Sequence, residues 1–246
     1  EKAQWSAEAS VLKAYYHFML VSTYGPIPVV DVNLPLSATV EEVRVKRNTV
    51  DYCFNYIATT IEAAIDDLPI KTTSVNEMGR IDQVIAASIK ARALLYAASP
   101  LYNGNSEFYE TFVNIDGEKL FNTQYDAEKW KLAADAAKEA ITLAESAGIS
   151  LYEFSGDELP VDSMLISVSE VRALYNYRYM FTDKWNSELV WGHSDPLISE
   201  WWSFQASTML KNPNSSSNEA AWQWVSPSLR MVESYYTKNG LPIDQD

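Results

Sequence analysis

Apolar residues recur at helical spacing through the first 150 positions, and this spacing predicts a series of helices. The first predicted helix lies within residues 8–24, and its apolar face consists of Leu12, Tyr15, Tyr16 and Met19. A Tyr-Gly-Pro-Ile-Pro sequence follows, in which Gly25 can take the left-handed conformation that ends a helix and Pro26 and Pro28 prevent a restart. We therefore expect a buried helix with a sharp end, whose core side chains are Tyr15, Tyr16, Phe18 and Met19.

A second helix is predicted after Asn48, because apolar residues there again share one helical face. That face consists of Val50, Cys53, Phe54, Ile57, Ile61, Ala64, Ile65 and Leu68. Pro69 then ends the helix.

Two further predicted helices carry alanines on their core faces. One runs from Asp82, a good N-cap residue, to Ser99, and its core consists of Ala86, Ala87, Ala91, Ala93, Leu94, Leu95, Ala97 and Ala98. The other begins near Asp126 and ends at Gly148, with an apolar face of Trp130, Ala133, Ala134, Ala137, Ile141 and Ala144. Small side chains let helix axes approach closely, and an aromatic residue followed by spaced alanines is similar to tetratricopeptide helix pairs.

Residues 151–246 have a different pattern. We expect one more helix at 167–181, a short strand or extended segment at 188–191, and loops elsewhere. The expected fold is therefore mainly α, with tetratricopeptide-like helix pairs packed against an irregular, loop-rich region with few short strands. We expect residues 1–246 to form a single domain, cut at both ends, with a helical part at 1–150 and a loop-rich part at 151–246.

Charge and cysteine content narrow the function classes. The net charge is −14 and Lys and Arg form no cluster, which argues against nucleic acid and anionic membrane surfaces as partners. No run of 18 apolar residues is present, so no segment is expected to span a membrane. The single cysteine, Cys53, permits neither an internal disulfide nor a cysteine metal site, and we expect it to be a small buried hydrophobe.

The sequence gives no positive argument for catalysis, a metal or a cofactor. Asp66 and Asp67 are neighbours at a helix end and point in different directions, and Asp157-Glu158 falls in a loop. We expect His17 to be a packing or rim residue, and His193-Ser194-Asp195 cannot form a relay because consecutive residues do not reach one another. No metal-ligand spacing, phosphate loop or dinucleotide motif is found.

Tryptophans concentrate late in the chain, with six of the eight after residue 184. A flat indole can stack on the apolar face of a sugar, while nearby amides and carboxylates bond its hydroxyls, and loops on a scaffold commonly carry such sites. The predicted ligand-binding residues are Trp185, Trp201, Trp202, Gln205, Trp222 and Trp224. The alternative is that these tryptophans are buried as a satellite core beneath the loops.

Several motifs in order along the chain resemble the SusD/RagB family of surface glycan-binding lipoproteins of Bacteroidetes-type outer membranes. They comprise residues 8–20, Tyr24-Gly-Pro-Ile-Pro28, Asp66-Asp-Leu-Pro69, Gly79-Arg80 with the alanine-rich helix to Ala98, Ser99-Pro-Leu-Tyr-Asn103, Trp130, Asn186-Ser-Glu188-Leu-Val-Trp191, Pro227-Ser-Leu and Tyr235-Tyr-x-x-Asn-Gly-Leu-Pro242. The resemblance covers nearly the whole chain and is carried by the order of the motifs.

The resemblance implies a binding protein without chemistry of its own. Such a protein binds oligosaccharide at the cell surface and delivers it to a TonB-dependent, SusC-like outer-membrane transporter, and it is held in the outer membrane by an N-terminal lipid anchor that would lie outside this chain. Family ligand sites vary in sequence, so the resemblance adds no site residue to those predicted above.

Two other functions remain open at this point. A peptide- or protein-binding scaffold at the cell surface predicts a groove lined by the helices of residues 1–150 and buried late tryptophans. A glycosidase requires two carboxyl groups facing one cleft, roughly 5 to 9.5 Å apart.

Overall fold

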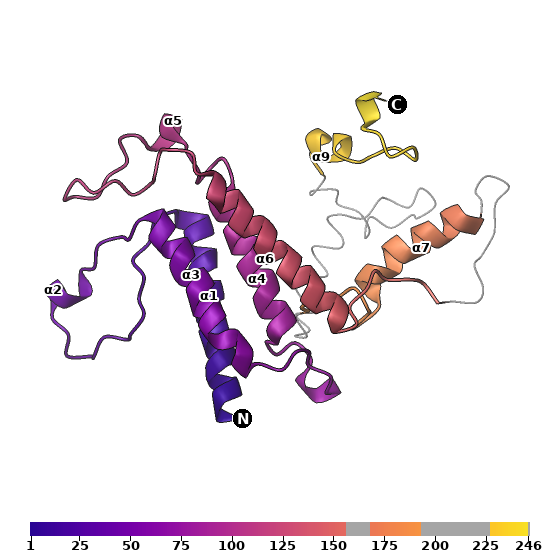
Figure 1. Cartoon of the computed structure of the whole chain (residues 1–246), viewed down its shortest axis with the longest axis horizontal. Coiled ribbons are helices and arrows are strands. Elements are labelled where there is room, and N and C mark those ends of the chain that lie inside the picture. The colour runs from indigo at the N-terminus through magenta and orange to yellow at the C-terminus, as the bar shows by residue number, and fades with distance from the viewer. Residues whose placement is uncertain (156–167, 193–226, 246) are drawn as a thin grey trace, which may run out of the picture. The chain divides into compact units, whose positions relative to one another are not determined.

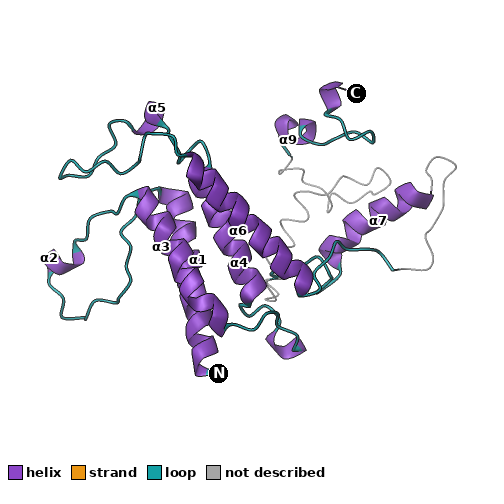
Figure 2. Ribbon diagram, in the orientation of Figure 1, coloured by secondary structure: helices purple, strands orange, loops and turns teal. Residues whose placement is uncertain are grey.

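The structure, a computed structural model, describes residues 1–155, 168–192 and 227–245. The described chain is mainly helical (Figures 1 and 2), as the sequence predicts. Its elements in order are α1 (Lys2–Tyr24), α2 (Val40–Val43), α3 (Val50–Ala64), η1 (Ile65–Asp67), η2 (Val75–Glu77), α4 (Gln83–Ala98), α5 (Ser106–Tyr109), α6 (Ala127–Ser146), α7 (Val168–Thr182), α9 (Leu229–Glu233) and η3 (Ile243–Gln245). In the described residues the only β pairing consists of two isolated bridges, Val113 with Lys119 and Tyr236 with Pro242.

The long helices form two antiparallel pairs. α1 packs along α3, and α4 packs along α6, while α3 and α4 bring the two pairs together (Figure 1). This is the arrangement of helical hairpins that the alanine pattern predicts. None of the helices in the described part of the chain combines the length and the apolarity that a membrane span requires.

The predicted helix ends are confirmed at four positions. Asp82 and Asp126 cap α4 and α6, because their carboxylates accept hydrogen bonds from the backbone N–H groups of Ile85 and Glu128. Gly25 and Gly148 follow α1 and α6 with φ of 71° and 76°, the left-handed region that ends helices.

The core is one cluster that joins α1, α3 and α4. Every apolar residue predicted for the α3 face from Val50 to Leu68 is buried or partly buried, including Cys53. α3 is strongly amphipathic because the other side of the helix carries polar residues such as Asn55, Thr59 and Glu62. The pattern of α3 therefore fixes its orientation.

The predicted core of α1 is partly wrong. Phe18 is buried and Tyr15 partly buried, but Tyr16 and Met19 are 61% and 46% exposed. The buried face of α1 consists of Ala7, Val11, Ala14, His17, Phe18 and Val21. Apolar residues lie on more than one side of α1, so their spacing alone could not select the buried face.

The predicted faces of α4 and α6 also need correction. Leu95 of α4 is half exposed, although the predicted alanines at 86, 87, 93, 97 and 98 are buried. α6 buries Ala133, Ala136 and Ala140, whereas Trp130, Ala134, Ala137 and Ile141 of the predicted face are exposed. The face that packs is the one on which only alanines lie, because small side chains allow the closest approach to α4.

The chain divides into two compact units, Glu1–His193 and Ser194–Asp246. The predicted helix at 167–181 is confirmed as α7, whereas the predicted strand or extended segment at 188–191 is wrong, because these residues pass through a turn and a bend that Asn186 holds. In the second unit, the described residues form α9, a turn closed by a hydrogen bond from the Thr237 N–H to the Leu241 carbonyl, and η3. A single domain over 1–246 stays a prediction.

Candidate ligand-binding site

The described part of the chain contains one of the six predicted ligand-binding residues, Trp185. The other five, Trp201, Trp202, Gln205, Trp222 and Trp224, lie outside the described residues. The candidate site is therefore built from Trp185 and the segment around it.

Trp185 lies in a turn that Asn186 holds together after α7. The Asn186 amide donates to the carbonyls of Met180 and Asp183, 2.7 and 2.9 Å away. Its oxygen accepts from the backbone N–H groups of Glu188 and Leu189. One side chain thus ends α7 and fixes the turn, an arrangement for which asparagine is well suited because it offers donors and an acceptor.

Two further contacts anchor the same segment to the rest of the unit. The Glu188 carboxylate accepts from the Tyr152 N–H, and the Trp191 indole N–H donates to the Gly79 carbonyl, 3.1 Å away. The Trp191 ring also meets the Tyr15 ring edge-on, with centroids 5.2 Å apart. Trp191 is therefore an anchor between the segment after α7 and α1.

Trp185 packs where two glycines allow a close approach. A β-carbon on Gly79 would lie 3.2 Å from the Gly192 carbonyl and 3.5 Å from the Trp185 ring, and one on Gly192 would lie 3.2 Å from that ring. Trp185 itself has a φ of 53°, a conformation uncommon outside glycine. The tight packing holds this backbone conformation in place.

The cavity beside Trp185 has a volume of about 60 Å³ and is lined by Gly79, Arg80, Asp82, Trp185, Trp191 and neighbouring residues. This volume has room for a few water molecules and is well below that of most small-molecule pockets. A ligand would therefore meet the outer surface of Trp185, of which 37% is exposed, and not this cavity. The role of Trp185 in binding stays a prediction.

The titratable groups near this cavity have structural roles. Asp82 caps α4, and its second oxygen accepts from the Thr72 N–H. Burial raises the pKa of Asp82, and the backbone N–H groups of Ile85 and Thr72 oppose that rise. Arg80 pairs with Glu8 and Glu77.

The earlier candidates for chemistry lie apart from one another. Asp66 lines a groove beside α6, whereas Asp67 lines a different groove between α1 and α3, so the adjacent acids do point in different directions. His17 is buried, with Nδ1 2.8 Å from the Lys13 carbonyl. Asp157, Glu158 and His193 lie outside the described residues, and among those described no group of three His, Cys, Asp or Glu could hold a metal ion.

The sequence singled out Trp185 but missed the residues that position it. Gly79 packs against the Trp185 ring, and Tyr15 and Gly79 anchor Trp191 of the same segment, although Trp191 lies 112 residues from the Gly79 carbonyl that it bonds. The available signals were the Gly-Arg pair at 79–80 and the Asn-Ser-Glu motif at 186–188.

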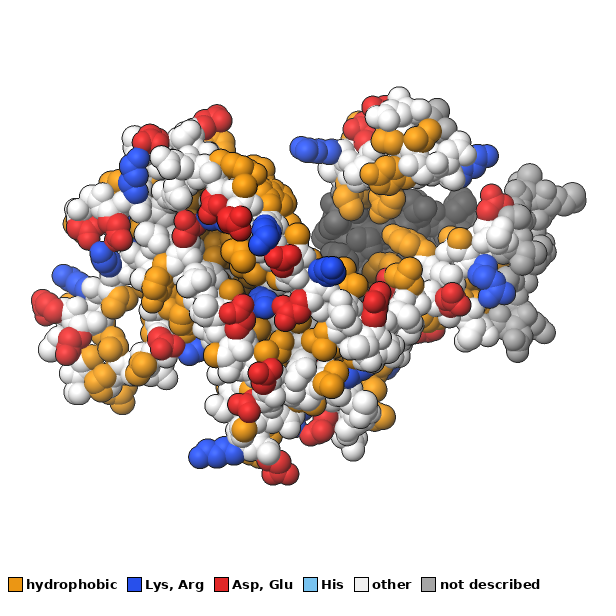
Figure 3. Space-filling view, in the orientation of Figure 1, with side chains coloured by type: hydrophobic (Ala, Val, Ile, Leu, Met, Phe, Trp, Pro, Cys, Tyr) orange, Lys and Arg blue, Asp and Glu red, His pale blue; other side chains and the backbone are white. Residues whose placement is uncertain are grey.

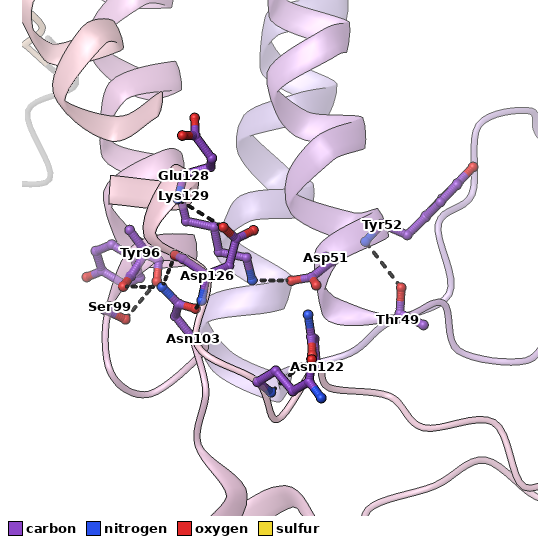
Figure 4. Close-up of polar contacts among 12 residues, drawn as sticks. Thr49, Asp51, Tyr52, Tyr96, Ser99, Asn103, Asn122, Asp126, Glu128 and Lys129 are labelled. Atoms are coloured by element: carbon purple, nitrogen blue, oxygen red, sulfur yellow. Dashed lines mark hydrogen bonds and ion pairs between the residues drawn. The ribbon is translucent and has the colours of Figure 1, made fainter. Parts of the chain in front are cut away.

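A set of polar contacts fixes the other end of the helical scaffold (Figure 4). Asn103 follows α4 and bonds the Asp126 backbone twice, since its amide donates to the Asp126 carbonyl and its oxygen accepts from the Asp126 N–H, both at 2.8 Å. Lys129 of α6 pairs with Asp51 of α3. These contacts join the two helix pairs at the start of α6.

Two packed helix pairs, joined to a tryptophan-bearing turn after α7, lie in the described part of the first unit. Residues 1–95 match a SusD-like family model whose description reads "Starch-binding associating with outer membrane". A solved structure named BT4246 is 33% identical over 100% of this chain and 43% of its own, with a TM-score of 0.81, and its selenomethionine form gives 0.78. A SusD-like protein of Bacteroides fragilis NCTC 9343, BF3747, is 17% identical over 98% of this chain and 37% of its own, with a TM-score of 0.66, and shows the same fold.

Comparison with curated proteins gives no match. The family match over residues 1–95 confirms the SusD/RagB resemblance, and the solved structures show that the same fold extends over the whole chain. It spans less than half the length of either solved structure.

Proposed function

We propose that this protein binds neutral oligosaccharides or polysaccharides at the cell surface and performs no chemistry on them. The observation that carries the proposal is the match of residues 1–95 to a family described as starch-binding and associated with the outer membrane. The chemistry of the chain is consistent with it, because the late tryptophans offer flat apolar surfaces for sugar rings.

The proposed binding residues are Trp185, Trp201, Trp202, Gln205, Trp222 and Trp224. Trp185 supports this assignment in one respect, since its ring is partly exposed on a segment that several hydrogen bonds hold rigid. A rigid aromatic platform loses little conformational entropy when a ligand binds.

The proposal extends to the partner and the location of the whole protein. The bound glycan passes to a TonB-dependent, SusC-like transporter, and a lipid anchor outside this chain holds the protein in the outer membrane. Both statements rest on the family resemblance and on the outer-membrane association in the family description.

Binding to an immobilised glycan panel, with release of reducing sugar measured in parallel, tests the proposal. We expect retention on at least one neutral polysaccharide and no release of reducing sugar. Trp201→Ala with Trp202→Ala should weaken retention at least tenfold, whereas Trp5→Ala, which removes an exposed tryptophan of α1, should not. Retention on no glycan, or equal retention by both variants, contradicts the proposal.

A peptide- or protein-binding scaffold is the second candidate function, favoured by one feature of the surface. The lobe around α2, at the lower left of Figure 3, exposes Val32, Leu34, Leu36, Val40 and Val43. Contiguous exposed apolar side chains often mark protein contacts. If this candidate is correct, Leu34→Asp with Leu36→Asp abolishes binding to a peptide library while the tryptophan variants leave that binding unchanged.

A further inference from the structure

A polar groove lies at the start of α3, on the helical part of the chain. We call it the Asn122 groove. Its volume is about 350 Å³, and its walls include Thr49, Asp51, Lys119, Phe121, Asn122 and Gln124. Figure 4 shows Thr49, Asp51 and Asn122 at the start of α3. None of these residues belongs to the predicted tryptophan site.

The walls of the Asn122 groove are held rigid by backbone and ring contacts. The Val50 N–H donates to the Leu120 carbonyl, 2.9 Å away, and ties residues 119–124 to α3. Phe121 is buried, and its ring stacks on that of Tyr109 with centroids 3.7 Å apart. A ligand therefore meets a preformed surface and little ordering cost is left for binding.

Two side-chain amides face solvent on this rigid segment. Asn122 and Gln124 are both exposed, and the Asn122 oxygen accepts from the Gln124 N–H, 3.1 Å away. This bond orients the Asn122 amide so that its NH₂ group stays a donor for a ligand. Each amide also carries a carbonyl oxygen with two lone pairs, so the pair supplies donors and acceptors together.

The neighbouring groups add acceptors and a hydroxyl. Asp51 uses one carboxylate oxygen for Lys129, which leaves the second oxygen as an acceptor at the groove. Thr49 accepts from the Tyr52 N–H at 3.2 Å, so its hydroxyl hydrogen is available as a donor.

The charges along the groove are balanced by partners outside it. Asp51 pairs with Lys129, and Lys119 pairs with Glu110. The Lys119 ammonium, followed by the Thr123 hydroxyl, lowers the pKa of Glu110, which keeps that pair charged near neutral pH. A groove of balanced charge with many donors and acceptors favours a neutral, hydroxyl-rich ligand over an ion.

We propose that the Asn122 groove is a second carbohydrate contact site, which holds one or two neutral sugar units. Each sugar hydroxyl both donates and accepts, and thus matches the amides of Asn122 and Gln124 and the oxygen of Asp51. The volume is at the small end of the range for small-molecule sites and fits a ligand of that size. The inference rests on the proposed glycan-binding function, but on different residues.

NMR of the whole chain, labelled with ¹⁵N, tests the groove directly. The probes are maltose, cellobiose, xylobiose, mannobiose and galactobiose. We expect at least one to shift the side-chain amide signals of both Asn122 and Gln124. The double variant Asn122→Ala with Gln124→Ala removes both amides. It should lower the affinity of the groove for that disaccharide on the order of tenfold, because two hydrogen bonds are lost.

A matched control and the tryptophan signals separate the two proposals. Asn55→Ala removes an exposed amide elsewhere on α3 and should leave the affinity unchanged. If indole N–H signals shift but those of Asn122 and Gln124 do not, the groove is not a site, although the proposed function stands. If neither set shifts with any probe, the groove proposal is overturned, and the proposed function is decided separately by retention on the glycan panel.

Discussion

Arg80 holds both carboxylate oxygens of Glu8. The terminal nitrogen Nη2 lies 2.8 and 2.9 Å from the two oxygens, and Nε lies 3.3 Å from one of them. Gln4 donates to the same carboxylate at 3.0 Å, and the other terminal nitrogen of Arg80, Nη1, donates to the Glu77 carboxylate. Two sequence motifs 72 residues apart, at the start of the chain and at Gly79-Arg80, are therefore one structural unit that ties α1 to the approach to α4.

Breaking the Arg80–Glu8 pair should lower stability, and lysine should not replace arginine. A lysine ammonium cannot match the planar fork that binds both carboxylate oxygens. We expect Glu8→Gln and Arg80→Lys each to lower the melting temperature by a few degrees in low salt. Lys131→Gln, which removes exposed contacts of 3.8 and 3.9 Å on α6, is the control and should change little. Equal melting temperatures for the unaltered protein and the three variants would show that the Arg80–Glu8 pair does not stabilise the fold.

Asn103 should be the more important of two nearby asparagines. Asn103→Ala leaves the Asp126 N–H and carbonyl without their partners at a partly buried site, so we expect a loss of about 1–3 kcal/mol in the free energy of unfolding. Asn105→Ala removes only the cap of the four-residue α5 and should cost less than about 1 kcal/mol. Urea denaturation measures both, and amide exchange at the start of α6 should accelerate only in Asn103→Ala. The reverse order of losses would contradict this role.

How far the sequence predicts this fold depends on the polarity of each helix. α3 was predicted residue by residue because a polar face opposes its apolar one, and Asp82 and Asp126 were predicted as caps from their residue type and position. α1 and α6 have apolar residues on more than one face, so periodicity could not choose between Met19 and Phe18, or between Ile141 and Ala140. The choice depends on which face permits close packing, and that is a tertiary property.

The candidate site was less predictable for a different reason. Its residue types were visible in the sequence, and Trp185 was named, but the contacts that fix Trp185 come from Gly79, Asn186 and Gly192. A close approach between Gly79 and Trp185 leaves no periodic pattern, since it joins residues over 100 positions apart. For the five predicted residues outside the described chain, the assignment stays a prediction.

Lys90 is a buried cation between two helices, and its ion pairs predict how charge removal changes the stability of the protein. Its ammonium lies 2.9 Å from Glu139 of α6 and 3.4 Å from Glu62 of α3. We expect Lys90→Met to change the free energy of unfolding by no more than about 1 kcal/mol, because the two glutamates are half exposed and regain water. Glu62→Gln with Glu139→Gln should cost about 2 kcal/mol, because a mostly buried charge loses both partners. Urea denaturation at neutral pH compares them, and a larger loss in Lys90→Met would contradict this account.

The raised pKa of Lys90 also predicts how the stability of the protein depends on pH. Burial alone lowers the pKa of Lys90, but the hydrogen bond to Glu139 and the charges of Glu139 and Glu62 outweigh it, so the pKa is raised above 10.5. A raised pKa in the folded state gives stability that is complete below the pKa of the unfolded chain and is lost as pH rises through the folded value. The stability of the protein relative to Lys90→Met should therefore be constant from pH 6 to 9 and fall only above about pH 10.5. A fall between pH 6 and 9 would require another titrating group.

A comparison of alanine variants at Gly79 and Gly117 distinguishes the effect of backbone strain from the effect of crowding against Trp185. Both have a positive φ, 95° and 84°, so alanine costs about 1–3 kcal/mol at either position through strain. A β-carbon at Gly117 meets nothing within 4 Å, whereas at Gly79 it lies 3.2 Å from the Gly192 carbonyl and 3.5 Å from the Trp185 ring. We expect Gly79→Ala to cost about 1 kcal/mol more than Gly117→Ala in urea denaturation and to change the tryptophan fluorescence, because the segment from Trp185 to Gly192 must shift. If Trp185 contacts the glycan, Gly79→Ala also weakens glycan binding and Gly117→Ala does not. Equal losses of stability in the two variants, with unchanged fluorescence, would mean that the added β-carbon at Gly79 is accommodated at no cost. The Trp185 segment would then not be the rigid platform proposed.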